Sequence, residues 1–249
     1  MADAFKAVVL AAGKGTRMMS ELPKVMHLVQ GLPMLSAPCD IAVAEGADEV
    51  AVVVGYGREL VEPFLASRYG ERVTTHIQHE MNGTADAVRS ALPAFANYDG
   101  GVLILYGDVP NLPAADVRNV IALHREGGTP LTMLSAIDTT KNAYGRIVRD
   151  DDGRALRIVE HEDASEAERQ IQEVNIGVYL VDGAFLREGL SRMTTDNAQG
   201  EFYLTDLIEM AAERGAPARV YIAPDIDALH GVNTSAELVR ADEYAADRA

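Results

Sequence analysis

The chain has 249 residues, of which 48% are hydrophobic and 24% are charged, as in ordinary globular proteins. Its formal net charge of −16 disfavours a surface for nucleic acid or an anionic membrane, because phosphate groups select basic faces. Cys39 is the only cysteine, which excludes an internal disulfide and a cysteine metal cluster. The N-terminus is unlike a signal peptide, and no apolar run approaches the roughly 20 residues of a membrane helix. We therefore expect a cytoplasmic protein with no nucleic-acid or membrane partner, although a small anionic ligand remains compatible with this charge.

Short apolar runs alternate with longer segments of mixed polarity in the first half of the chain. The predicted strands are 5–11, 49–55, 72–78 and 101–108, and the predicted helices are 34–45, 58–69, 83–96 and 113–126. Three of these strands are nearly continuous in Val, Ile and Leu, which is typical of strands buried on both faces. The sequence therefore predicts an open α/β fold, with a mainly parallel sheet and helices on both faces.

The alternation of predicted strands and helices changes after about residue 127. The predicted strands are 129–138, 144–150, 155–161, 173–181 and 219–223, and the predicted helices are 199–214 and 235–248. The "DDDG" stretch at 150–153 is a strong turn signal, so the two strands beside it are predicted to form a hairpin. Thr234 or Ser235 is expected to cap the last helix. We predict one domain over 1–249, with a nucleotide-binding half over 1–127 and a second lobe over 128–249.

The stretch "LAAGKGTRMMSELPKV" (10–25) places Lys14, Arg17 and Lys24 directly after a buried strand. Ligands of open α/β sheets bind beyond the carboxyl ends of strands, where free backbone N–H groups bind phosphate. The spacing does not match a P-loop, and Met18 stands where a dinucleotide-binding loop needs its third glycine. Spacing alone leaves open an ordinary glycine-containing turn with solvated basic residues.

Further motifs follow along the chain: "GTADA" (83–87), "LYGDVP" (105–110), "YGRIVRD" (144–150), "RIVEHEDA" (157–164), "ERQIQEVNIGVY" (168–179), "NAQGEFYLTDLI" (197–208) and "GVN" (231–233). With the loop at 10–25 and in this order, the chain resembles the sugar-nucleotide pyrophosphorylases. The resemblance is to the uridylyltransferase domain of bacterial N-acetylglucosamine-1-phosphate uridylyltransferases. It implies a Rossmann-like α/β fold with a mixed, mainly parallel sheet.

The resemblance also implies a reaction and its cofactor. The substrates would be UTP and N-acetylglucosamine 1-phosphate, whose phosphate oxygen attacks the α-phosphorus of the nucleotide with help from Mg²⁺. Arg17 and Lys24 would stabilise the phosphate charge, and Asp108 and Asn233 would bind the metal. As isolated residues, Asp108 is also compatible with a turn cap and Asn233 with a helix cap.

The remaining implied positions divide between the nucleotide and the sugar. The nucleotide-binding positions are Leu10, Ala11, Ala12, Gly13, Lys24, Gln78, Gly83, Thr84, Tyr106, Gly107 and Asp108, with uracil at Gln78, Gly83 and Thr84. The sugar-binding positions are Gly145, Glu160, Asn175 and Asn233, supported by Glu201, Tyr203 and Asp206. Gln78 suits a pyrimidine because its amide both donates and accepts hydrogen bonds.

Four residues depart from the family's usual pattern. Met81 replaces Gln and Asp86 replaces His beside the uracil positions, whereas Glu162 replaces Lys and Ile176 replaces Thr on the sugar side. The hexapeptide repeats of the bifunctional members are missing as well, so we expect neither acetyltransferase activity nor the trimer that those repeats build. The alternatives are another nucleotide or sugar phosphate on the same fold, a non-catalytic nucleotide-sugar-binding module, and, more distantly, a dehydrogenase.

Overall fold

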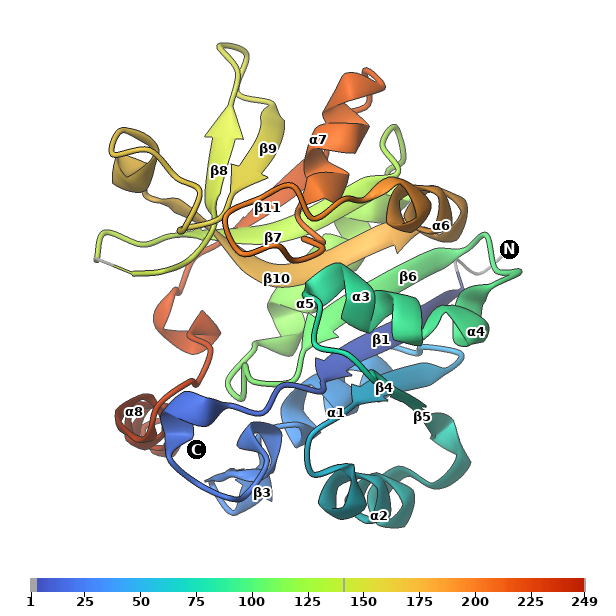
Figure 1. Cartoon of the computed structure of the whole chain (residues 1–249), viewed down its shortest axis with the longest axis vertical. Helices are drawn as coiled ribbons and strands as arrows, with labels where there is room; N and C mark the ends of the chain where they lie inside the picture. Colours follow the sequence, from blue (N-terminus) through green and yellow to red (C-terminus); the bar gives the residue numbers. More distant parts are fainter. Residues whose placement is uncertain (1–3, 141, 249) are drawn as a thin grey trace.

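The structure, a computed structural model, describes residues 4–140 and 142–248 and contains one large sheet flanked by helices (Figure 1). The strands of the first half are β1 (Phe5–Ala11), β4 (Val50–Val54), β5 (Val73–Ile77) and β6 (Gly101–Tyr106). Those of the second half are β7 (Leu131–Ile137), β8 (Arg146–Arg149), β9 (Ala155–Val159), β10 (Glu173–Asp182) and β11 (Arg219–Ala223). A small hairpin of β2 (Leu28–Val29) and β3 (Leu32–Pro33) lies apart from this sheet.

The strands of the large sheet lie in the order β11-β7-β10-β6-β1-β4-β5. All of them run parallel except β10, which pairs antiparallel with both β6 and β7. The predicted hairpin is confirmed, because β8 pairs antiparallel with β9 and also adds to the end of β10. The predicted mixed, mainly parallel sheet is therefore confirmed, and the strands of both halves belong to it.

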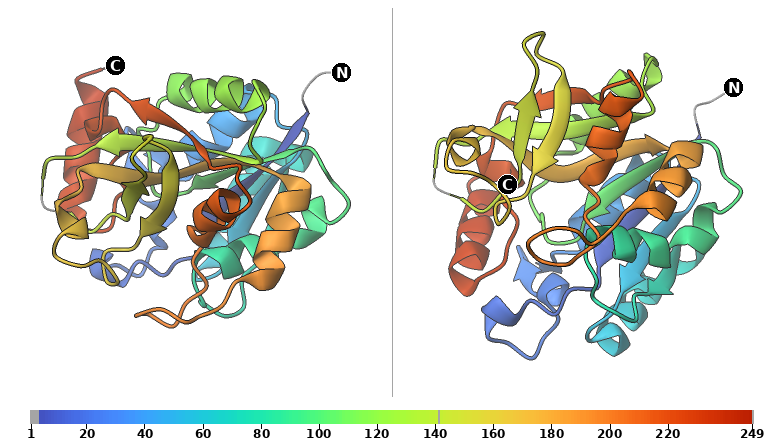
Figure 2. Two further views of the ribbon diagram at one scale, coloured as in Figure 1. Left: turned by 90° about the horizontal axis from the view of Figure 1, so that it is seen from above. Right: turned by 45° about the horizontal axis from the view of Figure 1, so that its top comes forward.

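Helices cover both faces of the sheet, as the views of Figure 2 show. One face carries α1 (Ser36–Ala44), α2 (Arg58–Tyr69) and α5 (Ala114–Arg125). The other carries α3 (Thr84–Ser90), α4 (Leu92–Phe95), α6 (Gly183–Arg192) and α7 (Asp206–Glu213), and α8 (Ser235–Ala246) packs near the β2-β3 hairpin. The short 3₁₀ helices are η1 (Thr16–Met18), η2 (Lys24–Met26), η3 (Gly70–Arg72), η4 (Glu168–Gln170) and η5 (Asp227–Leu229).

The two helical layers explain the continuous apolar runs of the central strands. Successive side chains of a strand point to opposite faces, so Val8 packs in one hydrophobic cluster and Val9 in the other. Both are fully buried. None of the helices within the described residues is long and apolar enough to cross a membrane.

Three helical segments differ from the prediction. The segment predicted as one helix over 83–96 forms α3 and α4, which meet at Ala91. Pro93 in the first turn of α4 has no N–H to continue the earlier helix. The helix predicted over 199–214 begins only at Asp206, and α6 was not predicted.

The late start of α7 has a tertiary cause. The backbone N–H of Phe202 donates to the carbonyl of Asn82 at 2.8 Å, and the N–H of Leu204 donates to Oγ1 of Thr84 at 3.0 Å. These bonds hold the segment against the loop before α3, so no helix forms there despite its helical pattern. The segment thereby contributes Glu201 to the cavity described below.

The final helix begins as predicted, with Thr234 as its N-cap. The N–H of Glu237 donates to Oγ1 of Thr234 at 3.3 Å, and the N–H of Thr234 donates to Oε2 of Glu237 at 3.0 Å. This capping box satisfies two N–H groups that the first turn of a helix leaves free. The same Glu237 carboxylate accepts the N–H of Asn233 at 2.7 Å, which anchors the residue just before the helix.

Candidate active site

A cavity of about 300 Å³ opens at the carboxyl ends of β1 and β6. Its lining includes ten of the predicted nucleotide positions: Leu10, Ala11, Ala12, Gly13, Lys24, Gln78, Gly83, Thr84, Tyr106 and Asp108. Val25, Met81, Ala87 and Glu201 complete the lining. The structure therefore brings together residues that are spread over nearly two hundred positions of the chain. Arg17 lies outside this lining, exposed on η1.

Lys24 lies between the two predicted metal ligands. Its Nζ donates to Oδ2 of Asp108 at 2.5 Å and to Oδ1 of Asn233 at 2.9 Å. A carboxylate oxygen and an amide oxygen thus point at one cationic group, which is the kind of donor set that a hard divalent cation takes. No group of three or more His, Cys, Asp or Glu side chains within the described residues could hold a metal ion. A cation here would complete its coordination with phosphate and water oxygens, as Mg²⁺ commonly does.

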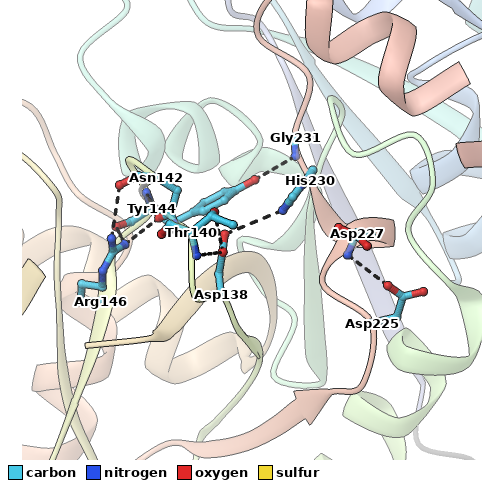
Figure 3. A network of polar contacts seen from close by, with 9 residues as sticks. All are labelled: Asp138, Thr140, Asn142, Tyr144, Arg146, Asp225, Asp227, His230 and Gly231. Carbon is cyan, nitrogen blue, oxygen red and sulfur yellow. Dashed lines mark hydrogen bonds and ion pairs between the residues drawn. The ribbon is translucent and has the colours of Figure 1, made fainter. Parts of the chain in front are cut away.

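The segment that carries Asn233 is tied to both halves of the sheet. The N–H of Val232 donates to the backbone carbonyl of Asp108 at 2.9 Å. The N–H of Gly231 donates to the hydroxyl oxygen of Tyr144 at 3.1 Å (Figure 3). Burial raises the pKa of Tyr144 to about 12, so its hydroxyl stays protonated at neutral pH. The position of Asn233 therefore depends on the strand end after β6 and on the segment before β8.

His230 and Asp138 extend this network (Figure 3). The His230 ring stacks on that of Tyr144 with centroids 6.3 Å apart, and its Nε2 lies 3.8 Å from Oδ2 of Asp138. Asp138 is buried and accepts the N–H of Thr140 at 2.7 Å. Arg146, also buried, donates to the carbonyl of Tyr144. Hydrogen bonds on two sides thus hold Tyr144 in place.

Two glycines allow the backbone around the cavity to pack closely. The N–H of Gly107 donates to the carbonyl of Leu10 at 2.9 Å, and a Cβ at position 107 would lie 2.8 Å from that oxygen. Gly83 has a φ of +104°, and a Cβ there would lie 2.6 Å from the carbonyl oxygen of Phe202. A larger residue at either position would displace the loops that line the cavity.

Three of the four predicted sugar residues, Gly145, Glu160 and Asn175, lie together. The N–H of Asn175 donates to the carbonyl of Gly145 at 2.9 Å. A Cβ on Gly145 would lie 2.7 Å from Cγ2 of Ile158 and 3.2 Å from Oε2 of Glu160. Thr205 donates its hydroxyl to Oε1 of Glu160 at 2.9 Å, while burial raises the pKa of this carboxyl. The arrangement provides a partly buried acceptor with one remaining oxygen for a ligand hydroxyl.

The four departures from the family's pattern lie in different environments. Asp86 accepts a hydrogen bond from Nε2 of Gln78 at 2.9 Å, and Met81 lines the cavity with a half-exposed side chain. Glu162 is exposed. Ile176 is 4% exposed and packs in the hydrophobic core. The departures beside the predicted base site therefore contact it, whereas Ile176 serves the core.

Sequence reasoning missed the residues that hold the Asn233 segment. Tyr144 belongs to the "YGRIVRD" motif without a predicted role of its own, and no role was predicted for His230. The contact between His230 and Asp138 joins residues 92 positions apart, with no spacing pattern that a sequence reading could detect. Only the "YGR" motif carried a signal, since it adjoins the predicted sugar residue Gly145.

Comparison with known proteins finds relatives of this chain both by sequence and by fold. The family model described as nucleotidyl transferase matches residues 6–227. The bifunctional protein GlmU of Sorangium cellulosum is 47% identical over 241 residues, which cover 95% of this chain and 51% of that protein. The GlmU of Pelobacter propionicus is 44% identical over 236 residues, which cover 94% of this chain and 51% of that protein. The chain thus spans about half the length of these curated relatives.

A solved structure shares the fold. It is reported as a glucose-1-phosphate thymidylyltransferase from Bacillus anthracis in complex with sucrose. It has a TM-score of 0.79 and covers 98% of this chain and 96% of its own, at 20% identity. Because the family model covers most of the chain and the cavity lies where open α/β sheets bind ligands, the chain belongs to the nucleotidyl transferase family.

Proposed function

We propose that the chain transfers a uridylyl group from UTP to N-acetylglucosamine 1-phosphate. An oxygen of the sugar phosphate bonds to the α-phosphorus of UTP, and the bond from that phosphorus to the bridging oxygen of the β-phosphate breaks. The products are UDP-N-acetylglucosamine and pyrophosphate. Such a reaction needs positioning and charge stabilisation rather than a covalent protein nucleophile.

The places of the cations in the structure support the roles that we propose for them. Lys24 reaches into the cavity, where its ammonium group would bind the α-phosphate and the sugar phosphate. Arg17 is exposed on η1 and free to bind the leaving pyrophosphate. The backbone of Leu10 to Gly13 would hold the nucleotide, and Gln78 with Gly83 and Thr84 would bind the uracil.

Asp108 and Asn233 are the proposed ligands of Mg²⁺. Their oxygens already converge on one cationic group, the ammonium of Lys24. Bound there with phosphate oxygens, Mg²⁺ would neutralise charge that develops on the transferred phosphoryl group. The sugar would bind beside Gly145, Glu160 and Asn175, where Glu160 offers a carboxylate oxygen to its hydroxyls.

One observation supports this proposal most directly: a single cavity collects Lys24, Asp108 and Gln78 from three separate loops of the predicted nucleotide half. The identity to GlmU proteins over nearly the whole chain supports the same sugar and nucleotide. A module that only binds a nucleotide sugar has no need for the cations that stabilise a leaving pyrophosphate.

The test is a matrix of pyrophosphate-release assays. UTP, CTP, GTP and TTP are each combined with N-acetylglucosamine 1-phosphate and with glucose 1-phosphate at millimolar Mg²⁺. We expect the highest kcat/KM for UTP with N-acetylglucosamine 1-phosphate, and no release when the metal is chelated. Preference for another pair would transfer the proposal to that nucleotide or sugar. Absence of release from every pair, with nucleotide-sugar binding retained, would establish the binding module instead.

A further inference from the structure

We propose that Asp86 determines the choice of pyrimidine by fixing the orientation of the Gln78 amide. The inference rests on the proposed function, because it takes Gln78 to contact the base. The side chain of Gln78 is buried at the edge of the cavity, directly after β5. Asp86 lies on α3 and approaches Gln78 from outside the cavity lining.

Both N–H groups of the Gln78 amide have acceptors within the protein. Nε2 lies 2.9 Å from Oδ2 of Asp86 and 3.3 Å from the carbonyl oxygen of Gly83. A primary amide has two N–H donors and one oxygen acceptor. These two bonds therefore leave Oε1 as the polar atom of Gln78 that is available to a ligand in the cavity.

Asp86 is the stronger of the two constraints. The oxygen and nitrogen of an amide have nearly the same shape, so the chemistry of the partners decides which way the group points. An ionised carboxylate only accepts hydrogen bonds, and it therefore holds the nitrogen of Gln78 on its own side. The Gly83 carbonyl makes the longer contact and already accepts the N–H of Ala87 at 3.2 Å.

An acceptor facing the base favours uracil over cytosine. Uracil carries a hydrogen on N3, which Oε1 of Gln78 can accept. Cytosine has a lone pair on N3, which would face the lone pairs of Oε1. Met81 cannot correct this mismatch, because its thioether is at most a weak acceptor.

An asparagine at position 86 would remove the constraint. Its amide can donate to Oε1 of Gln78 as readily as it accepts from Nε2, so only the longer contact with the Gly83 carbonyl still opposes the turned orientation of Gln78. The turned orientation presents an N–H to the cavity, which suits N3 of cytosine. The variant Asp86→Asn is nearly isosteric with the native residue, which keeps the volume of the site unchanged.

The experiment compares kcat/KM for UTP and CTP, each with N-acetylglucosamine 1-phosphate, in the native chain, Asp86→Asn and a control. The control is Glu80→Gln, which removes the same charge from an exposed side chain that bonds Asn82 rather than Gln78. We expect Asp86→Asn to lower the preference for UTP by about tenfold, the range over which single pocket contacts discriminate substrates. The change should appear mainly in the KM of the nucleotide, with Glu80→Gln unchanged.

Calorimetric titration of the same proteins with UTP and CTP separates this inference from the proposed function. A native chain that binds UTP better than CTP but releases no pyrophosphate would overturn the proposed function alone, and the ratio of the two dissociation constants would then test Asp86. A preference in Asp86→Asn within twofold of the native value, by rate or by binding, would overturn the role of Asp86. An equal loss of the preference for UTP in Glu80→Gln would also overturn the role of Asp86. A native chain that binds neither nucleotide would do the same.

Discussion

The ammonium of Lys24 and the carboxylate of Asp108 lie 2.5 Å apart, although 84 residues separate them in the chain. Asn233 accepts from the same ammonium. The lysine therefore occupies the position between the two oxygens that the proposed Mg²⁺ would use, and it would compete with the metal for them.

This competition gives a prediction for Lys24→Met. Turnover should fall by a factor of about 10² to 10³, because the variant lacks a cation aimed at the phosphates. In the absence of nucleotide, however, the variant should bind Mn²⁺ at least as tightly as the native chain. Electron paramagnetic resonance of free and bound Mn²⁺ measures this affinity. Loss of Mn²⁺ binding would contradict the assignment of Asp108 and Asn233 as ligands.

Arg17→Ala should lower kcat/KM by about two to three orders of magnitude, because it removes charge that stabilises the leaving pyrophosphate. The melting temperature should stay the same, since Arg17 is exposed on η1. Arg58→Ala is the control, as it removes another exposed arginine, from α2, whose ion pair with Glu62 is long at 3.6 Å. Turnover of Arg17→Ala near the native rate would show that Arg17 has no part in the chemistry.

Tyr144→Phe tests the support of the Asn233 segment. The variant keeps the ring that stacks on His230 but loses the oxygen that accepts the N–H of Gly231. Stability should fall by about 1 kcal/mol, the usual value of one hydrogen bond. The Mg²⁺ concentration for half-maximal rate should rise several-fold, because Asn233 is held less firmly. Tyr69→Phe loses a hydroxyl that bonds Asp40, outside the cavity lining, and should leave the Mg²⁺ requirement unchanged.

The raised pKa of Asp206 predicts how the stability of the chain depends on pH. Burial, and then the charge of Glu209, raises its pKa from 3.8 to about 6. The folded chain therefore binds this proton more tightly than the unfolded chain. The resulting stabilisation is complete below about pH 4 and is lost as the pH rises through 6. Asp206→Asn, which is always neutral, should gain melting temperature relative to the native chain at pH 7.5 but not at pH 4.

The control for this prediction is Asp196→Asn, in the exposed loop before α7. Its melting temperature should differ from that of the native chain by the same small amount at both pH values. A shift of Asp206→Asn that is equal at both pH values would mean that the carboxyl of Asp206 titrates alike in the folded and unfolded chains.

Thr234→Ala should destabilise the chain by about 1 kcal/mol through loss of the N-cap of α8. Thr234→Ser retains the hydroxyl that accepts from Glu237 and should lie within a few tenths of a kcal/mol of the native chain. Urea unfolding of the three proteins measures both differences. Equal destabilisation of the two variants would show that the methyl group, rather than the cap, stabilises this end of the helix.

The strands were the most predictable part of the structure. Val50–Val54 and Gly101–Tyr106 have buried side chains on both faces of the sheet. Their continuous apolar sequences predict this burial directly. Residues 201–205 carry a helical pattern and yet do not form a helix, because their backbone bonds to Asn82 and Thr84 instead. Such a partner lies more than a hundred residues away, and local propensity contains no information about it.

The candidate site was predictable through motifs rather than through geometry. Their order along the chain identified Lys24, Asp108 and Asn233, but only the fold shows that their polar groups meet. Asp86 was noted as a departure, and its bond to Gln78 depends on how the loop turns between β5 and α3. The role of Tyr144 was not predictable, because its hydroxyl accepts from a backbone N–H. Nearly every residue type at position 231 would provide that N–H, so the sequence there carries no signal.

The place of Asn233 near the end of the chain also determines when the site is assembled during synthesis. β1 can gain its neighbours β4 and β6 once residue 106 has emerged, and β10 can then enter between β6 and β7. At that stage Lys24 and Asp108 have been synthesised, whereas Asn233 has not. The oxygen that completes the set arrives some fifty residues after β10 ends, together with the capping box of α8. If Asn233 has its proposed role, a nascent chain would therefore remain inactive until every strand of the sheet has been synthesised.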